Sequence, residues 1–250
     1  MDEQTRAYMI DFTNRSFRDV ADKDYISARV LYRYGLGQQF LWSALQAIEK
    51  YLKAILLYND VSTKKLRHNL ETAFQKLSRI NDIPFKFPND VRDFIVYLNR
   101  EGANRYFEYP AYTIGEELLT LDRTIWHIRR YCYYMRGKRK TNSGNVDLLP
   151  HNLNYVHKYK PKDAHKFLIP DGGYLESVLS KPKKSQLRQN LVWKNFYYGS
   201  YKKNQIKQFR MDISFANPTH YIHPEVFQEL DRLVEFSKPV RCYFLKKGTK

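Results

Sequence analysis

Two stretches of the chain combine positive charge with aromatic side chains. Phosphate groups pair with Lys and Arg, and unstacked bases pack on aromatic rings, so this combination suits single-stranded RNA or nucleotides. The alternative is that the charges form a solvated face and the rings belong to the core. The candidate nucleic-acid-binding residues are Arg129, Arg130, Lys138, Arg139, Lys140, Lys183, Lys184, Arg188, Trp193, Tyr197 and Tyr198.

A candidate catalytic pair, Arg123 and His127, lies in the last predicted helix of the first half of the chain. Residues four apart on a helix share a face. An imidazole there can exchange a proton with a hydroxyl, and a guanidinium can neutralise charge that develops on a phosphate. For a histidine beside Trp126, a packing or surface role is the more common alternative.

The sequence offers little for metal or cofactor chemistry. His220 and His223 form a His-x-x-His pair with no cysteine nearby, which is a poor zinc signature, so we expect no bound metal and no cofactor. Neither a phosphate-binding glycine loop nor a Gly-x-Ser-x-Gly elbow occurs. P-loop nucleotide hydrolases and Rossmann-type dehydrogenases are therefore not expected.

Amphipathic helices are predicted to carry the residues of the first half. Their ranges are 21–34, 37–58, 69–80, 89–100 and 114–136. In the second helix apolar residues recur at helical spacing from Leu41 to Ile55, and Asn69 is a good N-cap for the third. Glycines and prolines punctuate the short connections, which favours an antiparallel, up-and-down helical bundle.

The composition changes at residues 136–145, a basic stretch with Ser, Asn and Gly that predicts a linker. We therefore expect two domains, residues 1–140 and residues 141–250. In the second domain, residues 209–215 and 240–245 are predicted to be strands and residues 224–234 a helix. The predicted fold is mainly α: a helical bundle followed by a small, basic, aromatic-rich α+β domain.

Charge and cysteine content indicate the partner and the compartment. The 250 residues include 43 Lys and Arg against 26 Asp and Glu, a formal net charge of +17 that indicates an acidic partner. Two cysteines are too few for a disulfide framework, which favours a reducing, cytoplasmic setting. No signal peptide or membrane-spanning stretch is apparent, so no membrane association is expected.

One segment of the first half has a recognisable pattern. The run Gln-Ala-Ile-Glu-Lys-Tyr-Leu-Lys-Ala-Ile-Leu-Leu occupies residues 46–57, and His-Asn-Leu follows at residues 68–70. Together they resemble the HEPN family of helical domains, over roughly residues 20–135. Nothing in the C-terminal half joins this resemblance. The residues that match the family motifs are Glu49, Lys50, Lys53, His68, Arg105 and Tyr109.

The resemblance implies a bundle of about five helices that usually forms a homodimer and binds RNA or nucleotides in the dimer groove. Many members are metal-independent ribonucleases that carry an Arg and a His with four to six residues between them, and others are inactive partners of nucleotidyltransferases. None of the seven histidines here follows an Arg at that spacing. Arg123 and His127, with three intervening residues, come nearest.

Three functions are consistent with these features. The first is an RNA- or nucleotide-binding protein of a toxin–antitoxin or antiviral defence system, a setting that rests on the resemblance. The second is a divergent, metal-independent endoribonuclease that uses Arg123 and His127. The third is an interaction module for a nucleotidyltransferase-like partner. Because the family's Arg-to-His spacing is not met, we expect recognition rather than robust RNA cleavage, and enzymatic activity stays open.

Overall fold

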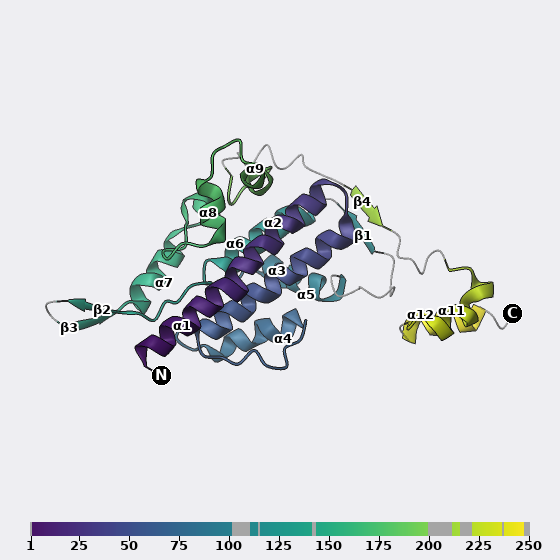
Figure 1. Ribbon diagram of the computed structural model, residues 1–250, viewed down its shortest axis with the longest axis horizontal. Helices are drawn as coiled ribbons and strands as arrows, with labels where there is room; N and C mark the ends of the chain where they lie inside the picture. The colour runs from purple at the N-terminus through teal and green to yellow at the C-terminus, as the bar shows by residue number, and fades with distance from the viewer. Residues whose placement is uncertain are drawn as a thin grey trace.

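The computed structural model describes residues 2–101, 111–114, 116–141, 144–199, 212–215, 222–236 and 238–247. Its fold is mainly α, as the sequence predicted (Figure 1). The helices of the N-terminal bundle are α1 (Glu3–Thr13), α2 (Asp19–Arg33), α3 (Gly37–Tyr58), α4 (Leu70–Gln75), α5 (Asn89–Glu101) and α6 (Glu117–Arg129). A π-helical segment, Asn14–Arg18, joins α1 to α2, and a 3-10 turn, Lys76–Arg79, follows α4. None of the helices within the described ranges is both long and apolar enough to span a membrane.

The centre of the bundle is α3, whose bounds match the predicted helix 37–58. Its apolar stripe, which includes Leu45, Ile48 and Leu52, is completely buried. Removing each such side chain from water contributes roughly 1.5–3 kcal/mol. Gly35 follows α2 with a φ of 74°, in the left-handed region that glycine adopts without strain, and this turn lets α2 and α3 pack together.

The short helix α4 begins as the sequence predicted. The side-chain oxygen of Asn69 accepts a hydrogen bond from the backbone N–H of Thr72 at 2.8 Å, which confirms Asn69 as the N-cap. The helix ends earlier than the predicted range 69–80, because its last turn tightens into the 3-10 segment. The predicted helix 89–100 corresponds to α5.

Three helices beyond residue 140 pack on the bundle. They are α7 (Leu149–Lys158), α8 (Tyr174–Ser180) and α9 (Gln186–Val192). In Figure 1, α8 and α9 lie beside α2. Val156, Leu175 and Leu191 are buried in the same apolar cluster as the stripe of α3. The apolar core therefore continues on both sides of residue 140.

A two-stranded antiparallel sheet joins distant parts of the chain. β1 (Ala111–Ile114) pairs with β4 (Asp212–Phe215), with residue 111 opposite residue 215. β4 confirms the C-terminal part of the strand predicted for 209–215. Residues 209–211 lie outside the described residues.

A β-hairpin occupies most of the range predicted as a linker. β2 (Lys138–Thr141) pairs antiparallel with β3 (Gly144–Asp147), with residue 138 opposite residue 147. The hairpin projects from the helices (Figure 1). Cross-strand backbone pairing thus gives this basic stretch a defined conformation.

The last helices are α11 (Phe227–Leu233), preceded by a 3-10 turn at 224–226, and α12 (Lys238–Lys247). The helix predicted for 224–234 is confirmed, whereas the strand predicted for 240–245 is wrong. Val240 and Phe244, one helical turn apart, pack with Phe227 and Phe236 in a separate apolar cluster. This spacing outweighs the β-branched and aromatic composition that favoured a strand. Both helices lie apart from the bundle in Figure 1.

Candidate functional site

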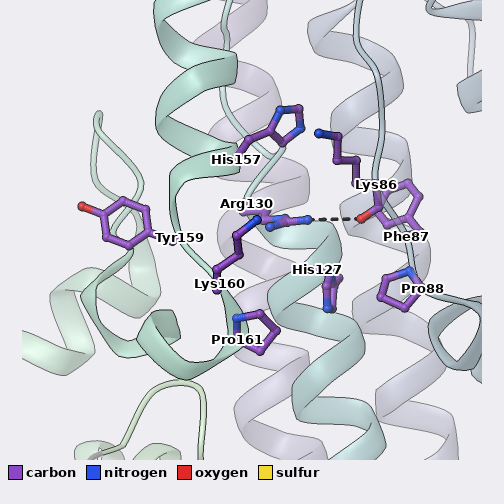
Figure 2. Close-up of a pocket in the computed structure, with 9 residues that line it drawn as sticks. All are labelled: Lys86, Phe87, Pro88, His127, Arg130, His157, Tyr159, Lys160 and Pro161. Carbon is purple, nitrogen blue, oxygen red and sulfur yellow. Dashed lines mark hydrogen bonds between the residues drawn. The ribbon is translucent and has the colours of Figure 1, made fainter.

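A pocket of about 300 Å³ lies where the end of α6 meets two other segments of the chain. We call it the histidine pocket. Figure 2 shows its cationic and imidazole side chains around one space, while the ring of Tyr159 turns away from them. The lining residues are Lys86, Phe87, Pro88, His127, Arg130, His157, Tyr159, Lys160 and Pro161.

The helix α6 brings His127 and Arg130 to one face, because they are three residues apart. It is shorter than the predicted helix 114–136 at both ends. Residue 114 belongs to β1. At the other end the N–H of Tyr131 bonds to the carbonyl of Ile128 at 3.0 Å, which is the tighter 3-10 pattern that closes many helices.

Arg130 is a buried cation held at the wall of the histidine pocket. Its Nη2 donates to the carbonyl oxygen of Lys86 at 3.1 Å (Figure 2), and its guanidinium carbon lies 4.7 Å from the centroid of the Trp126 ring. Burial lowers the pKa of Arg130, but a guanidinium stays charged at neutral pH. Its Nε has no hydrogen-bond partner among the described residues.

His127 is a buried imidazole without a hydrogen bond in the described part of the chain. The residue is 5% exposed, and neither Nδ1 nor Nε2 has a partner. Burial, followed by the charges of Arg130 and Arg123, lowers its pKa to about 3. The backbone of Lys86 lies near enough to oppose this shift slightly, but it makes no hydrogen bond of acceptable geometry with the ring. The ring is therefore neutral at neutral pH, with one N–H donor and one lone-pair acceptor unsatisfied.

Basic side chains also line the rest of the histidine pocket: Lys86, His157 and Lys160. His157 Nε2 lies 3.2 Å from the hydroxyl of Tyr131, which accepts the backbone N–H of Lys86 at 3.1 Å. Burial, then the charges of Lys86, Arg130 and Lys160, lower the pKa of His157. No Asp or Glu is among the described residues that line this pocket. The arrangement favours an anionic ligand.

A second pocket, of about 800 Å³, adjoins the first, since Lys160 and Pro161 line both. We call it the carboxylate pocket. It combines three acids, three cations and two aromatic rings. The lining residues are Asp90, Glu116, Leu119, Thr120, Asp122, Arg123, Lys160, Pro161, Lys162, Phe196 and Tyr197.

The candidate catalytic pair is divided between the two pockets. Arg123 lines the carboxylate pocket, where its Nε lies 2.9 Å from Oδ2 of Asp90. His127, one helical turn later, lines the histidine pocket beside Arg130. The guanidinium that shares a pocket with His127 is thus Arg130.

A family model described as the HEPN domain matches residues 15–122. Residues 15–122 form a HEPN domain. The rest of the chain matches no family model, and comparisons with curated proteins and with solved structures found no match. The matched range ends just before Arg123, within α6, so His127 and Arg130 lie a few residues past the match.

The motif residues of the HEPN domain stabilise its own helices. Glu49, only 4% exposed, accepts from Lys53 Nζ at 2.5 Å and lies 2.9 Å from His68 Nδ1. Lys53 also donates to the carbonyl of Arg67 at 3.1 Å, so the group ties α3 to the loop before α4. Lys50 donates to Asp24 on α2. The other two motif residues, Arg105 and Tyr109, lie outside the described residues.

Arg129 does not line the histidine pocket and pairs inside the protein. Its guanidinium contacts Asp22 of the HEPN domain at 2.7 and 2.9 Å and Glu176 of α8 at 2.8 and 2.6 Å. Burial would raise the pKa of Glu176, but the charge and hydrogen bonds of Arg129 hold it at about 2. Because the cation is neutralised and buried, we leave Arg129 out of the proposed binding surface.

The other predicted nucleic-acid-binding residues are spread over the molecule. Three are exposed on the β2–β3 hairpin: Lys138, Arg139 and Lys140. Lys183 and Lys184 are exposed before α9, and Arg188 donates to the carbonyl of Lys181 at 3.0 Å. The guanidinium of Arg33 lies 5.1 Å from the ring of Trp193. Tyr197 lines the carboxylate pocket, and Tyr198 is buried against Tyr25.

Sequence reasoning missed several residues of the two pockets. Lys86 lies between Pro84 and Pro88, and Lys160 directly precedes Pro161, so both lie in irregular segments outside the helices. No residue near His157 in the sequence indicated that it belongs to a binding site. A single sequence carries no signal that these segments meet the end of α6. Within the described ranges, no cluster of His, Cys, Asp or Glu could hold a metal ion.

Proposed function

We propose that this protein binds RNA or a nucleotide through a phosphate group in the histidine pocket. The observation that carries the proposal is the buried His127 ring, unpaired beside the buried guanidinium of Arg130. Buried polar groups are almost always hydrogen-bonded. The N–H donors of His127 and Arg130 would therefore be satisfied by a ligand that carries acceptor oxygens. A phosphate supplies such oxygens, and charge-assisted bonds to arginine are the strong ones.

The surroundings of the histidine pocket support a polyanionic ligand. Lys86 and Lys160 are exposed at its rim, where they can contact a second phosphate. The exposed hairpin cations Lys138, Arg139 and Lys140 add a further positive surface. The presence of a HEPN domain agrees with RNA or nucleotide binding, which is frequent in that family.

Further parts of the proposal rest on the family alone. We propose that the protein acts as a homodimer in the cytoplasm, in a toxin–antitoxin or antiviral defence system. The alternative partner is a nucleotidyltransferase-like protein, for which the HEPN domain would be an interaction module. Sedimentation at micromolar concentration tests the dimer, and co-purification distinguishes RNA from an acidic protein.

The binding test uses a double variant at the rim of the histidine pocket. Lys86→Ala with Lys160→Ala is expected to weaken single-stranded RNA binding about ten-fold and to reduce the salt slope by about 0.7, the value for one neutralised phosphate. The control, Lys64→Ala with Lys65→Ala, removes the same charge from exposed positions elsewhere. RNA affinity is measured by fluorescence anisotropy. If the two double variants weaken binding equally, the lysines act only by non-specific charge attraction, and the proposal that the histidine pocket binds the phosphate is refuted.

A second candidate function is metal-independent RNA cleavage. The favouring observation is that His127 is neutral at neutral pH, so its free nitrogen can accept a proton from a ribose hydroxyl. Arg130, rather than the predicted Arg123, would then stabilise the charge on the phosphate. A cleavage assay in EDTA with the His127→Ala variant tests this alternative.

A further inference from the structure

The carboxylate pocket contains one acid that the fold leaves incompletely satisfied. Asp122 is 1% exposed, the most buried residue of the pocket lining. Its Oδ1 accepts the hydroxyl of Tyr25 at 2.6 Å and the guanidinium of Arg29. Its Oδ2 has no partner in the described part of the chain. A buried carboxylate oxygen without a donor is costly, so a ligand that brings N–H groups to Asp122 would be stabilised there.

The same pocket offers an aromatic wall. Phe196 and Tyr197 both line it, with ring centroids 5.5 Å apart and nearly perpendicular planes. Tyr197 packs in turn against Trp126, at 5.7 Å, which fixes its ring. A planar heterocycle can stack on such a wall, and each base that stacks on an aromatic side chain contributes roughly 1–3 kcal/mol. An aromatic wall next to a buried acceptor is the chemistry of a nucleobase site.

The free oxygen of Asp122 favours some bases over others. Guanine presents two adjacent N–H donors on its Watson–Crick edge, and both can point to Oδ2, the oxygen of Asp122 that has no donor among the described residues. Adenine presents one amino group beside an acceptor nitrogen, and uracil presents one N–H between two carbonyl oxygens. Either base can offer Oδ2 only one N–H, and it brings an acceptor close to that oxygen, which weakens the contact. The other acids of the pocket are more open: Glu116 is exposed, and Asp90 pairs with Arg123.

We propose that the carboxylate pocket binds a guanine base, stacked on the ring of Phe196 with Tyr197 edge-on beside it and recognised through Asp122, while its phosphate lies in the histidine pocket. This proposal rests on the proposed function, because the two pockets are joined at Lys160 and Pro161. It adds a base preference that phosphate binding alone does not require.

The test compares nucleoside monophosphates on the unmodified protein by calorimetry. GMP is expected to bind at least about ten-fold tighter than AMP or UMP, and IMP, which lacks the exocyclic amine, to bind with intermediate affinity. If GMP, AMP and UMP bind with equal affinity, the base proposal is refuted while phosphate binding stands. If neither the nucleotides nor single-stranded RNA bind, both proposals are refuted.

Variants assign the preference to Asp122. Asp122→Asn is expected to abolish the difference between GMP and AMP, whereas Glu116→Gln, an exposed acid of the same pocket, should preserve it. Since Asp122 also contacts Arg29, the Asn variant could fail to fold, which circular dichroism would reveal. Phe196→Ala then serves instead, with the expectation that all nucleotides bind more weakly while inorganic phosphate binds as before. Loss of the preference in Glu116→Gln alone, or no effect of Phe196→Ala, would overturn the assignment.

Discussion

Arg129 and Arg130 are neighbours at the end of α6 but lie in opposite electrostatic environments. On one side, Asp22 and Glu176 neutralise Arg129 completely. On the other side, Arg130 faces the histidine pocket, whose described lining contains cations and imidazoles but no acid. The fold thus satisfies one cation with its own carboxylates, whereas the other has no acid in the described lining beside it and would meet an external anion in the function that we propose. The difference separates a residue that holds the structure together from one available for binding.

The Arg129 side is expected to show the largest effect on stability. Arg129→Gln leaves Asp22 and Glu176 buried without a counter-charge, and removing one partner of a buried pair typically costs about 3–5 kcal/mol. Urea denaturation followed by circular dichroism measures the change in the free energy of unfolding. Arg123→Gln, which removes a half-exposed partner of Asp90, serves as the control and should cost less than about 1 kcal/mol. If both variants lose a similar free energy of unfolding, Arg129 does not have the structural role that we assign to it.

On the side of the histidine pocket, the buried His127 is expected to make the free energy of unfolding depend on pH. The folded-state pKa of His127 is about 3, below the ordinary 6.5, so the unfolded chain takes up a proton below pH 6.5 that the folded protein does not. The free energy of unfolding should therefore fall as the pH drops from 6.5 towards 3, by about 1.4 kcal/mol per pH unit from this group. His127→Gln removes this contribution. Between pH 7 and pH 5 the wild type should consequently lose about 2 kcal/mol more than the variant.

A parallel loss in the two proteins would show that His127 is not held neutral. Other titratable groups, such as His157, affect both proteins alike, which is why the comparison uses the difference between the two proteins. Saturating phosphate sharpens the test. An anion in the histidine pocket favours the charged ring, so it should reduce the pH-dependent difference.

The sequence predicted the elements that have a strong local pattern. The range 37–58 matches α3 at both ends, because an uninterrupted apolar stripe runs along the whole helix. The strand predicted for 240–245 is wrong, since a short run of β-branched and aromatic residues fits either period and only the contact of Phe244 with Phe227 decides it. A long periodic pattern therefore suffices for prediction, whereas a short one needs tertiary contacts.

The site was less predictable for a different reason. Asp22 and Glu176 lie 107 and 47 residues from Arg129, so nothing in the neighbouring sequence distinguishes Arg129 from Arg130. His127 could be selected from its residue type and its helix face. The groups that make its environment, such as Lys86 and Lys160, come from segments that only the tertiary structure brings together.

A smaller effect is expected from the β2–β3 hairpin, and it tests whether bound RNA contacts the hairpin. Changing Lys138, Arg139 and Lys140 together to Ala is expected to weaken single-stranded RNA binding and to reduce the salt slope by about 0.7 for each phosphate that the hairpin no longer neutralises. Mononucleotide affinity should not change, because the hairpin residues do not line either pocket. An unchanged RNA salt slope would mean that the hairpin cations only solubilise the protein.

The smallest effect is expected in an RNA cleavage assay. Both candidate arginines already have partners in the protein. Arg123 is paired with Asp90, and Arg130 contacts the Lys86 carbonyl and the Trp126 ring. With a pKa of about 3, His127 is also a weak base, so proton transfer from a ribose hydroxyl has little driving force at neutral pH. We therefore expect no robust cleavage by the purified protein, with or without EDTA. Cleavage that His127→Ala abolishes in a folded variant would instead make the histidine pocket an active site, and cleavage that survives this change would place the chemistry elsewhere in the chain.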